Sequence, residues 1–247
     1  MTAVTTSVIP LRRSPRRGPY VRTLLWLVRG QFKVALWFVA ILTVLWGGAV
    51  LVASRFGDIE MSIMQFARQG AGVWFPFSIA VSSAAAALRP HVAAGMTRRV
   101  FARAALSASL VMAAVYGGVI TLGFVIERAV YQANGWHQTI TDSSWSFADV
   151  SDPAAVLGDG TLVIVVASLS GLLVGAVYLR YGAWIGTLSL PFTVGPVLVT
   201  LAALSRAVPI DGLTQPARIA IVVGIAGVLA AAFVAVVRTV PVLPPKG

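Results

Sequence analysis

The chain has 247 residues, of which 58% are hydrophobic and 11% are charged, and its mean hydropathy is +0.87. A soluble domain carries about 25% charged residues, so this composition excludes an ordinary soluble protein and predicts an all-α membrane protein. The absence of cysteine excludes disulfides, thiolate metal sites and cysteine nucleophiles.

The first 33 residues divide into a basic arm and a helix. Residues 1–18 hold four arginines and two prolines but too few apolar residues to form a core, so they predict a flexible arm. From Pro19 onward, a helical period brings Arg22, Arg29 and Lys33 within about 20° of one another, opposite an apolar face. Residues 19–33 therefore predict an amphipathic helix at the membrane interface, which either anchors the chain or braces the spans that follow.

Six long apolar runs follow this helix, and none of them contains Asp, Glu, Lys, Arg or His. Crossing about 30 Å of hydrocarbon takes about 20 helical residues, and every backbone polar group must be paired within the segment. The runs therefore predict six transmembrane helices in one domain, residues 34–238, at 34–54, 71–88, 104–126, 160–179, 182–204 and 219–237.

Two local patterns modify this reading of the fourth and fifth runs. Pro191 and Pro196 each remove a backbone donor, and they predict that the fifth span ends near Pro196, followed by a re-entrant or outer-leaflet segment to about residue 204. Four-residue glycine spacing favours close helix contact, either within the chain or between two chains. The glycines concerned are Gly171, Gly175, Gly182 and Gly186.

The longest loop, residues 127–159, holds five of the eight acidic residues together with several aromatic ones. It predicts a small folded cap on the outer side of the membrane. Glu127, His137 and Asp142 could be combined into a metal site, but a lone histidine with scattered carboxylates lacks ligand spacing. We expect no metal here, and interfacial aromatic residues are the favoured interpretation.

Charge sorting predicts the orientation of the chain. If both termini are cytoplasmic, 14 of the 19 Lys and Arg residues lie inside and all eight acids lie outside. Because Lys and Arg near span ends set orientation, we expect an even number of spans in the cell membrane, with the tail 239–247 inside. The net charge of +11 follows from this sorting and from lipid contact, without a nucleic-acid partner.

The inner loop between the second and third runs reads HVAAGMTRRVFAR, residues 91–103. Pro90 marks the end of the second run, and residues 91–94 can form one helical turn. Gly95 permits a positive φ, and Thr97 can cap the third span. Anchoring by positive charge accounts for the arginines at its base, whereas a protruding hairpin exceeds what anchoring requires. These arginines are Arg98, Arg99 and Arg103.

The stretch AAGMTRRVFARA, residues 93–104, resembles the loop between spans two and three in permease subunits of bacterial ABC transporters, of the ABC-2-type exporter class. GLLVGAVYLRYG, residues 171–182, is a second similarity, and the predicted architecture is similar too. In that family the loop is a coupling helix that docks on the ATP-binding subunit. The chain differs in having its longer outer loop after span three rather than between spans five and six. The resemblance implies a coupling role for His91, Val92, Gly95, Met96, Thr97, Arg98, Arg99 and Arg103.

The expected function is thus an exporter permease that forms the translocation pathway and hydrolyses nothing itself. The sequence has no nucleotide-binding glycine loop and no histidine in any predicted span, so we expect no cofactor on this chain. ATP and Mg²⁺ would belong to a cytoplasmic ATP-binding cassette partner, and a second permease chain and membrane lipids are the other expected partners. Two alternatives stay open: a non-transporting scaffold or assembly factor, and an ion-coupled transporter, for which the charge-free spans offer no coupling group.

Overall fold

The computed structural model describes residues 18–141, 146–147, 150–205 and 214–241, and the elements in these ranges are all helical. The predicted arm 1–18, except for Gly18, and residues 242–247 of the predicted tail therefore lie outside the described residues. In chain order the elements are α1 (Pro19–Ala53), α2 (Met64–Ala67), the π-helical turn η1 (Arg68–Gly72), α3 (Val73–Ala93), α4 (Arg98–Ala133), α5 (Pro153–Leu188), α6 (Leu190–Leu204) and α7 (Gln215–Thr239).

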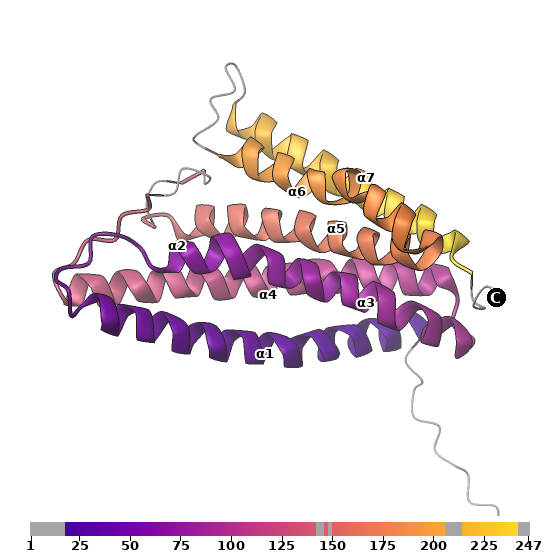
Figure 1. Ribbon diagram of the computed structural model, residues 1–247, viewed down its shortest axis with the longest axis horizontal. Helices are drawn as coiled ribbons and strands as arrows, with labels where there is room; N and C mark the ends of the chain where they lie inside the picture. The colour runs from indigo at the N-terminus through magenta and orange to yellow at the C-terminus, as the bar shows by residue number, and fades with distance from the viewer. Residues whose placement is uncertain (1–17, 142–145, 148–149, 206–213, 242–247) are drawn as a thin grey trace, which may run out of the picture.

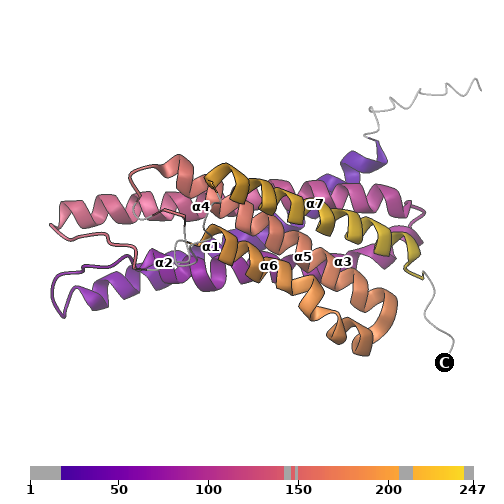
Figure 2. The ribbon, with the colours of Figure 1, turned by 90° about the horizontal axis from the view of Figure 1, so that it is seen from above.

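The helices run roughly along one axis and alternate in direction (Figures 1 and 2). Helix α1 forms one side of the bundle, α6 and α7 form the opposite side, and α3, α4 and α5 lie between them (Figure 1). Helix α5 is the central element, because it packs against α3, α4, α6 and α7 and is buried along most of its apolar length. Helices α1 and α7 leave most of their apolar surface uncovered.

The first described turn of α1, the α3–α4 turn, the α5–α6 bend and the last turn of α7 share one end of the bundle (Figure 1). We name this the basic end, because nine of the thirteen described Lys and Arg residues lie in the half of the bundle that it closes. These are Arg22, Arg29, Lys33, Arg89, Arg98, Arg99, Arg103, Arg180 and Arg238. The described acids occupy the opposite half, at the end of α4, the start of α5 and the loop after α1. The charge sorting read from the sequence is therefore a spatial separation.

Among the described residues, five helices are long and apolar enough to cross a membrane: α1, the stretch Met64–Ala93, α4, α5 and α7. Large apolar side chains on their outer faces are uncovered, as with Trp37, which is 74% exposed, and Val44 and Leu51 nearby. A soluble monomer rarely exposes so continuous an apolar surface to water, whereas in a membrane the lipid chains cover it. The prediction of a helical, multi-pass membrane protein is confirmed at this level.

The predicted amphipathic helix and first span are one continuous helix. Helix α1 contains 35 residues without a break at residue 33, and at 1.5 Å per residue it is about 52 Å long. This exceeds the roughly 30 Å of hydrocarbon by a wide margin. Pro19 stands in its first turn, where a missing backbone donor costs nothing.

The chain bends at Gly182 and Ser189 rather than at the two prolines predicted to break the fifth span. Gly182 has φ +79°, a conformation that only glycine adopts readily. Pro191 lies in the first turn of α6, where it fits, and Pro196 lies inside α6 without ending it. Helix α6 spans only 15 residues, about 22 Å, and it runs as one helix to Leu204 instead of dividing at Pro196.

Glycines on α5 set the packing of the bundle centre. A Cβ at Gly175 would lie 2.5 Å from the carbonyl oxygen of Val81, and one at Gly171 would overlap the carbonyl oxygen of Phe77. Backbones of α3 and α5 therefore touch directly, as small-residue contacts in membranes allow. Gly171 and Gly175 therefore form a contact within the chain, which is one of the two interpretations that their spacing allowed.

Candidate functional site

The α3–α4 turn is a compact reversal of the chain that is held by backbone hydrogen bonds. Helix α3 continues through Pro90 to Ala93, and Gly95 then takes φ +80°. The amide of Gly95 donates to the Val92 carbonyl at 3.0 Å, and the amide of Met96 donates to the His91 carbonyl at 3.1 Å. These bonds satisfy carbonyls that a helix end would otherwise leave open. Thr97 then starts α4, its hydroxyl accepting from the Val100 amide at 3.3 Å, as the sequence indicates.

The predicted independent helical turn at residues 91–94 is absent. These residues form the last turn of α3, because the ring of Pro90 removes one backbone bond but its neighbours keep helical geometry. The reversal therefore protrudes less than the sequence suggests, and it is rigidly continuous with α3.

The turn is held against three other helices. The His91 ring lies 5.0 Å from that of Trp26 on α1 and 5.6 Å from that of Phe101 on α4, measured between ring centroids. The Arg98 guanidinium donates to the Arg238 carbonyl at 2.9 Å, which joins the start of α4 to the last turn of α7. A displacement of this turn therefore acts on α1, α3, α4 and α7 together.

The surface of the turn is small, basic and open. Ala93, Ala94, Gly95, Thr97 and Arg99 are exposed, while Val92, Met96 and Arg98 are half-buried. Arg103 is exposed on the next turn of α4, whereas Phe101 between them is fully buried. Within the described part of the chain no carboxylate lies at this end, so the arginines present unneutralised charge. The structure thus brings the eight coupling residues predicted from the sequence into one contiguous segment.

The remaining predicted residues lie elsewhere. Arg22, Arg29 and Lys33 line a groove between α1 and α3, described below. Gly182 is the bend of α5, and Gly186 lies against the ring of Tyr178, whose hydroxyl is hydrogen-bonded to Thr187 at 2.9 Å. This second glycine pair therefore shapes the α5–α6 bend rather than a contact between straight helices.

A buried carboxylate, Glu127, is an important residue that the sequence placed in a solvent loop. Its side chain is fully buried near the end of α4 and accepts hydrogen bonds from the Ile63 and Met64 amides at 2.9 and 2.8 Å, and from Ser62. The Trp46 indole at 3.0 Å and the Gln138 amide at 2.9 Å complete the set. This carboxylate fastens α1, the start of α2 and the loop after α4 to one another.

A buried ion pair lies nearby and was also missed. Arg68, in the π-helical turn, donates to Asp159 of α5 at 2.8 Å, with side-chain exposures of 2% and 4%. The Arg68 guanidinium also lies 5.3 Å from the centre of the Phe147 ring. A helical wheel continued past the apolar runs could have found both sites. Glu127 is three residues after buried Phe124, and Asp159 is three after buried Val156.

The metal alternative receives no support from Glu127, whose carboxylate is occupied by protein donors. His137 is held through its backbone amide, which donates to the Ile59 carbonyl at 3.2 Å, and Asp142 lies outside the described residues. In the described ranges, no group of three or more His, Asp or Glu side chains could hold a metal ion.

The exposed groups of the α3–α4 turn define what this surface can bind. They are backbone, small side chains and guanidinium groups. Guanidinium groups suit acidic partners, because they pair with carboxylates in a planar, two-point geometry. No family model, no curated protein and no solved structure matches this chain.

Proposed function

We propose that the chain is the permease subunit of an ABC-type exporter, and that its α3–α4 turn docks on a separate cytoplasmic ATP-binding subunit. The observation that carries the proposal is the bracing of the turn through the His91 aromatic contacts and the Arg98 hydrogen bond. A turn that only anchors two spans needs charge at the lipid surface but no contacts to helices distant in sequence.

The contacts suit a turn that transmits force. A partner that pushes on Gly95, Thr97 and Arg99 would move the end of α3 and the start of α4 as one unit, because hydrogen bonds close the turn between them. Through Trp26 and the Arg238 carbonyl the same displacement reaches α1 and α7. ATP hydrolysis in the partner would in this way drive rearrangement of the spans.

The direct test co-expresses this chain with candidate ATP-binding cassette proteins and purifies the two together. We expect a complex whose ATPase activity in proteoliposomes depends on the permease. Because the chain has no cysteine, Thr97→Cys supplies a unique thiol that should cross-link to the partner. Arg99→Ala should weaken the complex about tenfold, as loss of an interfacial arginine commonly does.

A matched control removes the same charge from the other half of the bundle. Arg55→Ala, in the exposed loop after α1, should leave the complex unchanged. Absence of any co-purifying ATPase, or equal weakening by both variants, would overturn the proposal. A stable complex without substrate movement would favour the scaffold alternative.

The Arg68–Asp159 pair gives specific support to a second candidate, an ion-coupled transporter. The sequence argument against that class was the lack of ionisable groups in the spans, and this pair is buried within the bundle. Buried charges in membrane proteins often mark ion pathways, and π-helical turns frequently occur at functional sites. For this candidate, Asp159→Asn should abolish gradient-driven transport while exposed Asp58→Asn should not. Transport that needs ATP and no gradient would eliminate it.

A further inference from the structure

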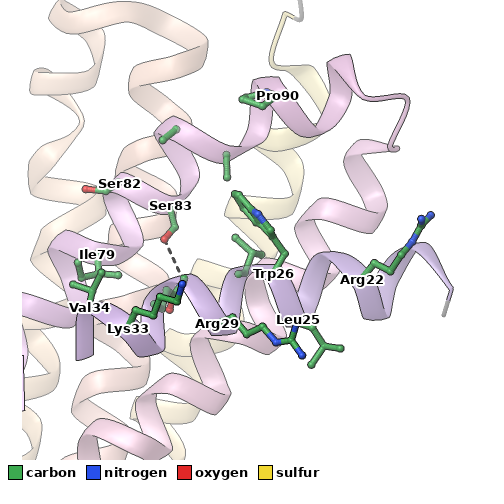
Figure 3. A pocket seen from close by; sticks show the side chains of 15 residues that line it. Arg22, Leu25, Trp26, Arg29, Lys33, Val34, Ile79, Ser82, Ser83 and Pro90 are labelled. Carbon is green, nitrogen blue, oxygen red and sulfur yellow. Dashed lines mark hydrogen bonds between the residues drawn. The ribbon is translucent and has the colours of Figure 1, made fainter. Parts of the chain in front are cut away.

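A groove separates the first half of α1 from the second half of α3 at the basic end (Figure 3). Its volume is about 820 Å³, within the range of roughly 300–1,000 Å³ common for sites that bind small molecules. The groove exists because α1 packs mainly against α4 and touches α3 at few places. These contacts are the Phe38–Phe75 stack, the Gln31–Ser83 hydrogen bond of 3.1 Å and the Trp26–His91 contact.

The walls of the groove are apolar, and small side chains on α3 leave it open. Leu25, Leu27 and Val34 contribute from α1, opposite Ile79 and Ala86 on α3. Trp26 extends from α1 toward α3 near Pro90 (Figure 3). An indole with one apolar face and one polar N–H suits the boundary between acyl chains and headgroups.

Three cations border this apolar groove: Arg22, Arg29 and Lys33. All three are exposed, and no acidic residue lines the groove. In the described part of the chain none of them forms a salt bridge. Their spacing of seven and four residues puts them in a row on one face of α1, about 16 Å from first to last. Uncompensated positive charge beside an apolar trough matches an anionic amphiphile.

We propose that this groove binds one anionic phospholipid, with an acyl chain between α1 and α3 and its phosphate beside Arg29 and Lys33. Charge complementarity selects the occupant, because a zwitterionic lipid would bring a cationic headgroup toward the cations. The bound lipid fills the space that side chains leave between α1 and α3. The inference is independent of transport and holds equally for a scaffold.

The test is native mass spectrometry of the purified full chain, incubated with dioleoylphosphatidylglycerol or with dioleoylphosphatidylcholine. We expect one retained phosphatidylglycerol and at least fivefold less phosphatidylcholine, since each cation near a lipid surface contributes about a fivefold preference. Arg29→Ala/Lys33→Ala should reduce the retained phosphatidylglycerol by fivefold or more. Arg99→Ala/Arg238→Ala, with the same charge loss at the same end but outside the groove, should retain it.

A second pair of variants separates a groove from a charged surface. Ala86→Phe fills the groove and keeps every cation, so it should displace the lipid, whereas Ala85→Phe, exposed on the same helix but outside the lining, should not. Both positions are exposed, so neither substitution puts a larger side chain into the core. Lipid retention by Ala86→Phe, equal retention of the two lipids, or displacement by 10-fold excess of glycerol phosphate over lipid would overturn the proposal.

Discussion

At the residue scale, the buried charges in the half of the bundle opposite the basic end need the most compensation by hydrogen bonds. A carboxylate removed from water is costly unless donors replace the lost hydration. Glu127 meets this requirement with five hydrogen-bond donors drawn from α1, the start of α2 and the loop after α4. Its role follows from those donors, for which the carboxylate is the shared acceptor.

Replacing this carboxylate by an amide of the same shape tests the role directly. Glu127→Gln turns an acceptor oxygen into a donor that faces other donors, and we expect it to lower the free energy of unfolding by about 2–4 kcal/mol. Glu60→Gln, an exposed acid in the adjacent loop, should change it by less than about 0.5 kcal/mol. Thermal unfolding in detergent, followed by tryptophan fluorescence, measures both. Equal melting temperatures would show that the hydrogen-bond set is dispensable.

At the scale of elements, the α3–α5 contact decides how the bundle centre packs. The glycine spacing on α5 could be read from the sequence, but its partner could not, because helix pairing depends on the whole arrangement. The same limit explains the fifth span. Proline is a strong break signal in sequence, yet at the first turn of α6 it is harmless, and glycine with a positive φ makes the bend instead.

A pair of alanine substitutions tests this contact against helix propensity. Gly175→Ala puts a methyl group onto the α3 backbone and should destabilise the protein by about 1–3 kcal/mol. Gly224→Ala on α7 meets open space and should be neutral, or stabilising by up to about 1 kcal/mol, because alanine favours helix. Chemical unfolding in mixed micelles compares the two. If Gly175→Ala also stabilises, direct contact between the α3 and α5 backbones is wrong.

At the scale of the molecule, composition and periodicity predict a helical membrane protein and most of its helices, and charge sorting predicts which ends lie together. The glycine and the threonine cap of the α3–α4 turn could also be predicted from the sequence. The buried charges are missed when each helix is taken to end with its apolar run, because the helices continue beyond the runs. Helix α4 extends seven residues beyond the run that indicated it, and Glu127 lies in that extension.

The absence of cysteine makes the orientation of the whole chain measurable. Single substitutions Thr97→Cys and Asp58→Cys place one thiol at each end of the bundle. A membrane-impermeant maleimide applied to intact cells should label Asp58→Cys and leave Thr97→Cys unlabelled until the cells are opened. A cytoplasmic basic end is the expected outcome under the positive-inside rule. The reverse labelling would place the α3–α4 turn on the outer side of the membrane, where no cytoplasmic ATPase can bind it.

The glycine contact also limits how the molecule can move. Sliding α5 along α3 would bring the side chains beside Gly171 and Gly175 onto the carbonyls of Phe77 and Val81, so the two helices are locked in register. A close backbone contact of this kind resists translation but tolerates a small rotation. Helix α1 lies on one side of it and α6 and α7 lie on the other. The outer helices could therefore rotate in opposite directions about this contact, while α3 and α5 keep their packing.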